Sequence, residues 1–112
     1  MNFDSDLIRG VADLIILKLV SERAMYGYEI IKLVNERTNG KFEWKEGTLY
    51  PVLHRLEASK LLSAEWQDAG NGRRRKYYRL ALAGEKVLSG KKTEWKEFCT
   101  AVDAVLLAAQ GI

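Results

Sequence analysis

Two stretches decide the fold of this chain of 112 residues: residues 47–56, GTLYPVLHRL, and residues 72–79, GRRRKYYR. The first carries apolar residues at the spacing of one helix face, and the second is a run of cations and tyrosines beside a turn signal. A helix with a polar outer side can enter the major groove of DNA, and a basic hairpin beside it can hold the flanking phosphates. The pair therefore predicts a DNA-binding layout.

The proline of the first stretch indicates where its helix begins. Proline is tolerated in the first helical turn, where backbone N–H groups have no partner, so Pro51 predicts a start at Gly47 or Thr48, with Thr48 as a candidate cap. An apolar stripe at i, i+3, i+4 and i+7 from Leu49 should face the core. Four polar or aromatic residues lie off this stripe: Thr48, Tyr50, His54 and Arg55.

A hairpin should follow this helix. Residues 62–66 and 78–80 alternate apolar and polar side chains as half-buried strands do, and residues 69–72 (AGNG) give a strong turn signal. The expected result is a two-stranded wing. Tyr77 and Tyr78 are neighbours in a strand and must point to opposite faces, and Tyr78 is predicted to be the buried one.

Two further helices are expected before the first stretch. Residues 5–20 are apolar on most of the helix circumference, so this helix should be buried on two sides, with a second chain covering part of it. Residues 26–38 form another helix pattern, which Asn39 and Gly40 end as a left-handed cap would. These helices and the wing make a winged helix-turn-helix.

A last helix is expected from Ala83 or Gly84 onward. Trp95, Phe98, Val102, Val105 and Ala109 are spaced as the seam of a coiled coil over two heptads, which is too short to be stable alone. This helix should pack on the first helix, on a partner's copy of itself, or on both. The predicted dimer interface comprises Leu7, Val11, Leu14, Ile15, Leu88, Trp95, Phe98, Val102, Val105 and Leu106.

Composition limits the other classes of protein. With 47% hydrophobic and 29% charged residues the chain can form one small domain, and it has no apolar run of the roughly eighteen residues that a membrane span needs. Its first residues lack the features of a signal peptide, so a cytoplasmic protein is expected. The net charge of +3 is concentrated in residues 41–81, which hold nine Lys/Arg and five Asp/Glu.

The sequence offers no set of residues for catalysis or for a metal. Cys99 and His54 are the single cysteine and the single histidine, too few for an internal disulfide or a zinc site. His54 has no serine, cysteine or carboxylate that a motif would pair with it as a nucleophile or acid–base partner. We therefore expect neither an enzyme nor a cofactor.

Three blocks of the sequence resemble a known family. Residues 26–30 (YGYEI), 46–57 (EGTLYPVLHRLE) and 72–80 (GRRRKYYRL) are similar, in order and spacing, to the signature blocks of PadR-type transcriptional regulators. The single short C-terminal helix resembles the small-sized branch of that family. The fold expected is mainly α with a two-stranded β wing (α+β), with a DNA-binding domain at residues 1–81 and a dimerisation helix at residues 82–112.

The resemblance implies a bacterial homodimer that binds a palindromic operator in double-stranded DNA, usually as a repressor. Its DNA contacts would fall on Tyr28, Thr48, Tyr50, Pro51, His54, Arg55, Arg73, Arg74, Arg75 and Lys76. A winged-helix adaptor is the rival hypothesis, in which the basic wing contacts an acidic protein partner. It predicts that no palindromic site is enriched from random DNA.

Trp95 has two interpretations. On a seam position it would be part of the dimer core. In the small branch of the family, a tryptophan in this region can line a cavity at the dimer centre and stack on flat aromatic compounds, so a small planar aromatic ligand could contact Trp95, with Lys91 and Cys99 nearby. The neighbouring lysines would suit an anionic ligand. Cys99 itself is expected to be a small buried hydrophobe.

Overall fold

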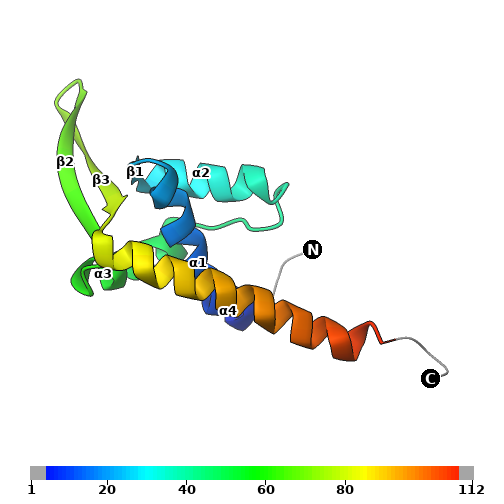
Figure 1. Ribbon diagram of the computed structural model, residues 1–112. Helices are drawn as coiled ribbons and strands as arrows, with labels where there is room; N and C mark the ends of the chain where they lie inside the picture. Colours follow the sequence, from blue (N-terminus) through cyan, green and yellow to red (C-terminus); the bar gives the residue numbers. More distant parts are fainter. Residues whose placement is uncertain (1–4, 109–112) are drawn as a thin grey trace.

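The computed structural model describes the backbone of residues 5–108 and the side chains of residues 9–108. The elements follow in the order α1 (Ser5–Glu22), β1 (Met25–Tyr26), α2 (Gly27–Arg37), α3 (Glu46–Ala58), β2 (Leu62–Gly70), β3 (Arg73–Leu80) and α4 (Leu82–Leu106) (Figure 1). This order and the α+β class confirm the predicted winged helix-turn-helix with a trailing helix. Leu7 and Ala109 fall outside the described side chains.

Helix α1 lies at the centre of the domain. It contacts α2, α3, α4 and β3, and it buries Ala12, Ile16, Leu17, Leu19 and Val20 almost completely. The apolar circumference of α1 is therefore covered in large part by its own chain. Val11, Leu14 and Ile15 remain half-buried on the side toward α4 and α2.

The sheet has one strand more than the predicted wing. Its order is β1-β3-β2, all antiparallel, and Met25 and Tyr26 pair with Tyr78 and Tyr77. The helix pattern of the sequence includes Tyr26, whereas in the structure this residue belongs to β1 and directly precedes α2 as its N-cap. A strand of two residues has no periodicity of its own, so only its pairing with β3 reveals it.

The hairpin of β2 and β3 turns at Asn71 and Gly72, whose φ angles of +53° and +72° suit the tight turn that fits the twist of two antiparallel strands. A bulge between Asp68 and Gly70 increases the local bend near the tip. Tyr78 is buried at the base of the wing, as predicted.

Helix α3 begins earlier than the sequence suggested. The carbonyl of Lys45 accepts hydrogen bonds from the N–H groups of Thr48 (2.9 Å) and Leu49 (3.0 Å), so Glu46 is the first helical residue and Thr48 is not the cap. Pro51 is the sixth residue and lies in the second turn, which corrects its predicted place in the first. The missing N–H affects one helical bond, to the exposed Gly47, whose carbonyl can meet solvent instead.

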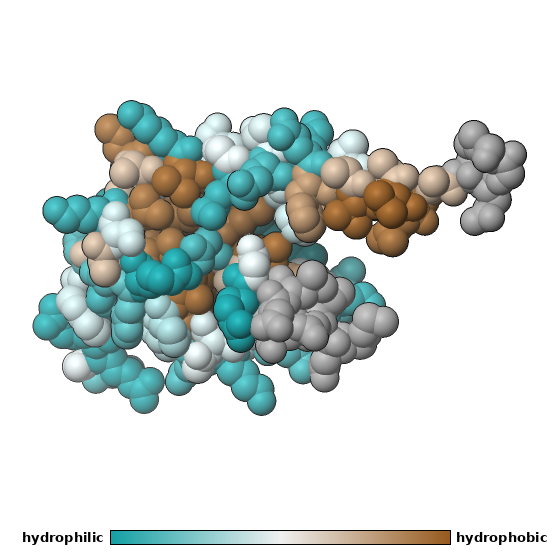
Figure 2. Space-filling model, turned by 90° about the horizontal axis from the view of Figure 1, so that it is seen from below, coloured by the Kyte–Doolittle hydropathy of each residue, from teal (hydrophilic) through white to brown (hydrophobic). Residues whose placement is uncertain are grey.

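The final helix has two different halves. Its first half packs on α1, with Leu88 in the core and Gly84 so close to the carbonyl of Leu61 that a Cβ there would clash. Its second half continues past the rest of the domain (Figure 1). Figure 2 shows apolar surface gathered on this projecting part, where Phe98, Val102, Val105, Leu106 and Leu107 are exposed. No helix among the described residues is long and apolar enough to cross a membrane.

Candidate nucleic-acid interface

The outer side of α3 carries most of the residues predicted to read DNA. Leu49, Leu53 and Leu56 are buried against the core, which fixes the rotation of the helix about its axis. That rotation leaves Thr48, Pro51, His54 and Arg55 exposed on the opposite side. The predicted apolar stripe of α3 is thus confirmed for these three leucines.

Tyr50 is half-buried and anchors α3 to the beginning of α2. A Cβ atom placed on Gly27 would lie only 2.5 Å from the hydroxyl oxygen of Tyr50, so the tyrosine occupies the space that a side chain at position 27 would need. The ring centres of Tyr50 and His54 are 6.3 Å apart. No local pattern signals the contact of Tyr50 with Gly27, because it joins two helices through their packing alone.

Two of the predicted DNA-contacting cations have acidic partners. Arg55 forms a bidentate ion pair with Asp13 of α1, and this pairing raises the pKa of the Arg55 guanidinium. The Nζ of Lys76 lies 2.8 Å from Glu57 of α3, whose carboxylate likewise raises the pKa of Lys76. The first pair joins α3 to α1, and the second joins β3 to α3. Both cationic side chains are therefore held in defined positions.

Two of the exposed wing arginines lie over aromatic rings. The guanidinium carbon of Arg75 is 4.5 Å from the ring centre of Tyr26, and that of Arg74 is 5.6 Å from Trp66. Neither aromatic residue belongs to the site predicted from the sequence. The alternation of the strands could have suggested the Trp66–Arg74 contact, because residues diagonal to each other across two strands share a face.

A cleft of about 390 Å³ joins α3 to the wing. Its lining contains Tyr26, Gly27, Tyr50, His54, Trp66, Arg74, Arg75, Lys76 and Tyr78. Its lining combines aromatic rings with cations, which is a chemistry that suits a phosphate backbone. Tyr28 is 64% exposed at the start of α2, with its ring 6.4 Å from that of Tyr26, whereas Arg73 is exposed at the wing tip.

A separate groove of about 640 Å³ runs between α1, α2 and α4. Trp95, which is 45% exposed, and the half-buried Cys99 both line it, together with Lys92 and Lys96. Lys91 lines a neighbouring groove of about 320 Å³ with Trp95 and Phe98. The three residues of the predicted ligand site are therefore close together on α4, although Lys91 opens to the second groove.

The residues predicted for the dimer interface fall into distinct environments. Leu88 is only 8% exposed because its own chain already covers it, whereas most of the others on α4 are open.

Among residues 9–108 no group of three or more histidine, cysteine, aspartate or glutamate side chains is arranged to hold a metal ion.

Comparison with known proteins gives a consistent result. Residues 16–90 match the transcriptional regulator PadR-like family. An uncharacterized protein of Lysinibacillus sphaericus, protein X, is 44% identical over 99 residues, which cover 88% of this chain and 91% of that protein. The structure of a transcriptional regulator from Clostridium thermocellum is similar at a TM-score of 0.82 and 36% identity, covering 90% of this chain and 95% of that one. The structure of a PadR family transcriptional regulator from Eggerthella lenta is similar at a TM-score of 0.81 and 32% identity, covering 93% of this chain and 88% of that one.

Proposed function

This chain belongs to the PadR-like family of transcriptional regulators, which bind DNA, and we propose that it acts as a homodimeric repressor of a palindromic operator. The observation that carries the proposal is the cleft whose lining includes residues of α3 and of the cationic wing. A helix and a wing on one surface can contact base edges and flanking phosphates at the same time.

The proposed contacts divide by chemistry. Thr48, His54 and Arg55 offer side-chain hydrogen-bonding groups from the exposed side of α3 to base edges or phosphates, whereas the wing offers charge. For Tyr28, which is exposed at the start of α2, the proposed contact is with the DNA phosphate backbone. Further proposed contacts come from Tyr50, Pro51, Arg73, Arg74, Arg75 and Lys76.

A second copy of the chain is the proposed partner of the projecting half of α4. This half exposes apolar side chains beyond the body of the protomer, and burying them between two copies is favourable. A twofold dimer presents two α3 helices to successive turns of the major groove, which is why the operator should be palindromic. Residues 82–112 would thus set the spacing for the domain at residues 1–81.

A small planar aromatic ligand is the proposed inducer. The groove beside Trp95 has apolar walls and the cations Lys92 and Lys96, which favour an aromatic compound with a negative charge. A ligand that binds better to a dimer with a different α3 spacing would shift the population away from the operator-bound form. Quenching of tryptophan fluorescence in the wild type and its loss in Trp95→Phe would support this site, whereas an unchanged quench would exclude Trp95 from it.

Selection from random double-stranded DNA tests the central proposal. We expect enrichment of a palindrome whose half-sites lie one helical turn apart, and binding that weakens steeply as salt rises. His54→Ala should relax the preference for the enriched sequence, while Lys41→Ala, in the exposed loop between α2 and α3, should leave the preference unchanged. No enriched palindrome, together with binding insensitive to salt, would favour the adaptor function instead.

A further inference from the structure

We propose that Trp66 and Tyr26 are positioning residues that hold Arg74 and Arg75 over two different rings, so that the two guanidinium groups contact different phosphates. This inference rests on the proposed DNA-binding function and assigns separate roles to two arginines that are adjacent in sequence. It also gives a role in DNA binding to Trp66, which is 54% exposed and would otherwise be an unexplained aromatic side chain on the surface.

The strand register defines the two faces. Trp66 lies opposite Lys76, so Arg74, two residues before Lys76, is its diagonal neighbour on the same face. Lys76 reaches Glu57, which shows that this face of the wing looks toward α3. The contact of Arg74 with Trp66 is therefore made on the side of the wing that faces α3.

The other arginine follows the same rule on the opposite face. Tyr26 lies opposite Tyr77, so Arg75, two residues before Tyr77, is the diagonal neighbour of Tyr26. The guanidinium of Arg75 stacks on Tyr26 at 4.5 Å, within the range of an effective cation–π contact. Arg74 and Arg75 thus leave β3 on opposite sides of the strand, and each guanidinium lies over a different ring in the lining of the same cleft.

Tyr26 is itself held firmly. Its N–H donates to the carboxylate of Glu29 at 3.2 Å, and Arg23 pairs with the same carboxylate at 2.8 Å. Its ring meets Tyr77 edge-on at 5.4 Å. The position of Arg75 is thus determined by the start of α2, which links the wing to the helix-turn-helix.

Ordering before binding is the expected benefit. A free arginine loses rotamer freedom when it contacts a phosphate, and an aromatic partner that already restricts the side chain reduces that loss. Removing the ring while keeping the arginine should therefore weaken binding by roughly two- to fivefold. The number of phosphates contacted, and hence the dependence on salt, should not change.

The salt dependence of operator binding separates the two kinds of residue. Because the proposed homodimer carries each substitution twice, the slope of log K against log salt should lose about 1.8 in Arg74→Ala and in Arg75→Ala, and about 3.6 in the double variant. Trp66→Leu and Tyr26→Leu should keep the wild-type slope and lose affinity. Tyr26→Phe, which retains the ring, should bind like the wild type, and the charge control Lys41→Ala should keep the full slope.

Crossed double variants test the pairing directly. Trp66→Leu should have no further effect in Arg74→Ala but its full effect in Arg75→Ala, and Tyr26→Leu should behave in the reverse way. Equal effects of each leucine variant in both arginine backgrounds would overturn the proposal. If the wild type has no salt-dependent operator binding, the proposed function fails; if it binds but the crossed effects are additive, only this inference fails.

A second measurement needs no substitution, in case Tyr26→Leu does not fold. Protons above the face of an aromatic ring shift upfield in NMR spectra, so the side-chain protons of Arg74 and Arg75 should lie upfield of those of Arg73 in the free protein. If the side-chain protons of all three arginines have the chemical shifts of an unstructured arginine, the proposal is also overturned.

Discussion

The guanidinium of Arg55 donates two hydrogen bonds to the carboxylate of Asp13, from Nη1 to Oδ2 at 2.9 Å and from Nη2 to Oδ1 at 2.5 Å, and so ties α3 to α1. The pair uses two of the five N–H donors of the arginine, which leaves the others free to reach DNA. Helix α1 also contacts α4, whose projecting half is the proposed dimerisation arm. The ion pair therefore connects α3, through α1, to the helix that carries this arm.

Replacing Asp13 by Asn should separate the positioning of Arg55 from its charge. Asp13→Asn is expected to lower operator affinity while keeping the salt slope, whereas Arg55→Ala should lose affinity and about 1.8 of the slope, one phosphate contact from each protomer. Because the pair is partly exposed, the melting temperature should fall by only about 2 to 4 °C, from a loss of roughly 0.5 kcal/mol. A wild-type slope in Arg55→Ala would mean that this arginine serves only the contact with α1.

A side chain at position 27 is expected to displace Tyr50. In Gly27→Ala the new methyl group would overlap the Tyr50 ring, and displacing this half-buried ring should cost about 1 to 3 kcal/mol of stability and reduce operator binding. Removing the ring should relieve the overlap, so the double variant Gly27→Ala/Tyr50→Ala should be destabilised less than the two single effects predict. Thermal unfolding measures the change in stability, and the fluorescence anisotropy of a labelled operator measures the change in DNA binding.

Gly90 provides the matched control for this substitution. It lies inside α4 with nothing within 4 Å of the position that a methyl group would take, so Gly90→Ala should gain about 0.5 to 1 kcal/mol from helix propensity. Similar losses at both glycines would show that Tyr50 is not the cause of the effect at position 27.

Local patterns in the sequence predicted the parts of the molecule that local chemistry specifies. The repeat of Leu49, Leu53 and Leu56 identified the buried side of α3, and Asn71 and Gly72 identified the wing turn. Helix α3 begins before the predicted Gly47 or Thr48, because its proline is not confined to the first turn. The exposed surroundings of Gly47 make one missing helical bond tolerable there.

Contacts between distant residues could not be predicted in this way. Asp13 and Arg55 are 42 positions apart and meet only because α1 and α3 pack at one particular angle. The same holds for Gly27 with Tyr50 and for Tyr26 with Arg75, each of which depends on where α2 begins. The residues that position the site therefore emerged only from the fold, whereas the exposed cations were evident from the sequence.

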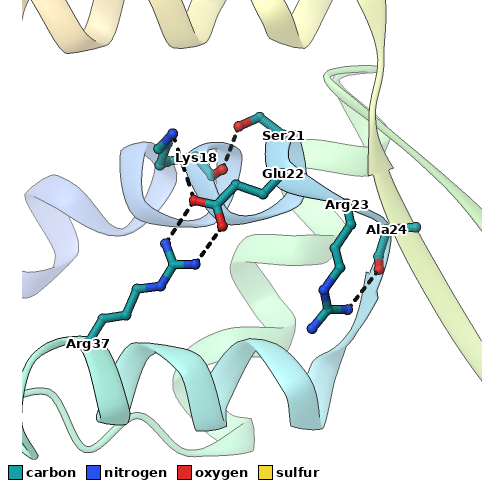
Figure 3. Close-up of polar contacts among 6 residues, drawn as sticks. All are labelled: Lys18, Ser21, Glu22, Arg23, Ala24 and Arg37. Carbon is teal, nitrogen blue, oxygen red and sulfur yellow. Dashed lines mark hydrogen bonds and ion pairs between the residues drawn. The ribbon is translucent and has the colours of Figure 1, made fainter.

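The ion pair between α1 and α2 should make stability depend on pH in a defined range. Figure 3 shows Glu22 between Arg37 and Lys18, and the hydrogen bonds from Arg37 are the main reason that the pKa of Glu22 falls from 4.5 to about 2. A lowered pKa in the folded state means that the stabilisation is complete above the unfolded value of 4.5 and disappears as the pH falls toward 2.

Thermal unfolding of the wild type and of Glu22→Gln across this range measures the effect. The wild type should melt at a higher temperature near neutral pH, and the difference should shrink between pH 4.5 and 2, where Glu22 becomes protonated and resembles the amide. Other carboxylates titrate in both proteins, so the difference isolates Glu22. A difference that persists undiminished at pH 2 would contradict the assignment.

The projecting end of α4 should control both assembly and DNA affinity. Val105 and Leu106 are 78% and 72% exposed in the protomer, and Val105→Asp/Leu106→Asp would place two charges in the proposed apolar interface. Light scattering should find a dimer for the wild type and a monomer for this variant. Ser89→Asp, which adds a charge to an exposed site nearer the body of the domain, should remain a dimer.

The monomeric variant should keep its folded DNA-binding domain but contact only one half-site. Its salt slope should therefore fall to about half of the wild-type value, because half of the phosphate contacts are lost. The variant should bind a single isolated half-site as tightly as one protomer of the wild type does. Its affinity for the full palindrome should be much lower than that of the wild type. A variant that remains a dimer, or a monomer that binds the palindrome with the full slope, would show that this end of α4 does not set the spacing of the two α3 helices.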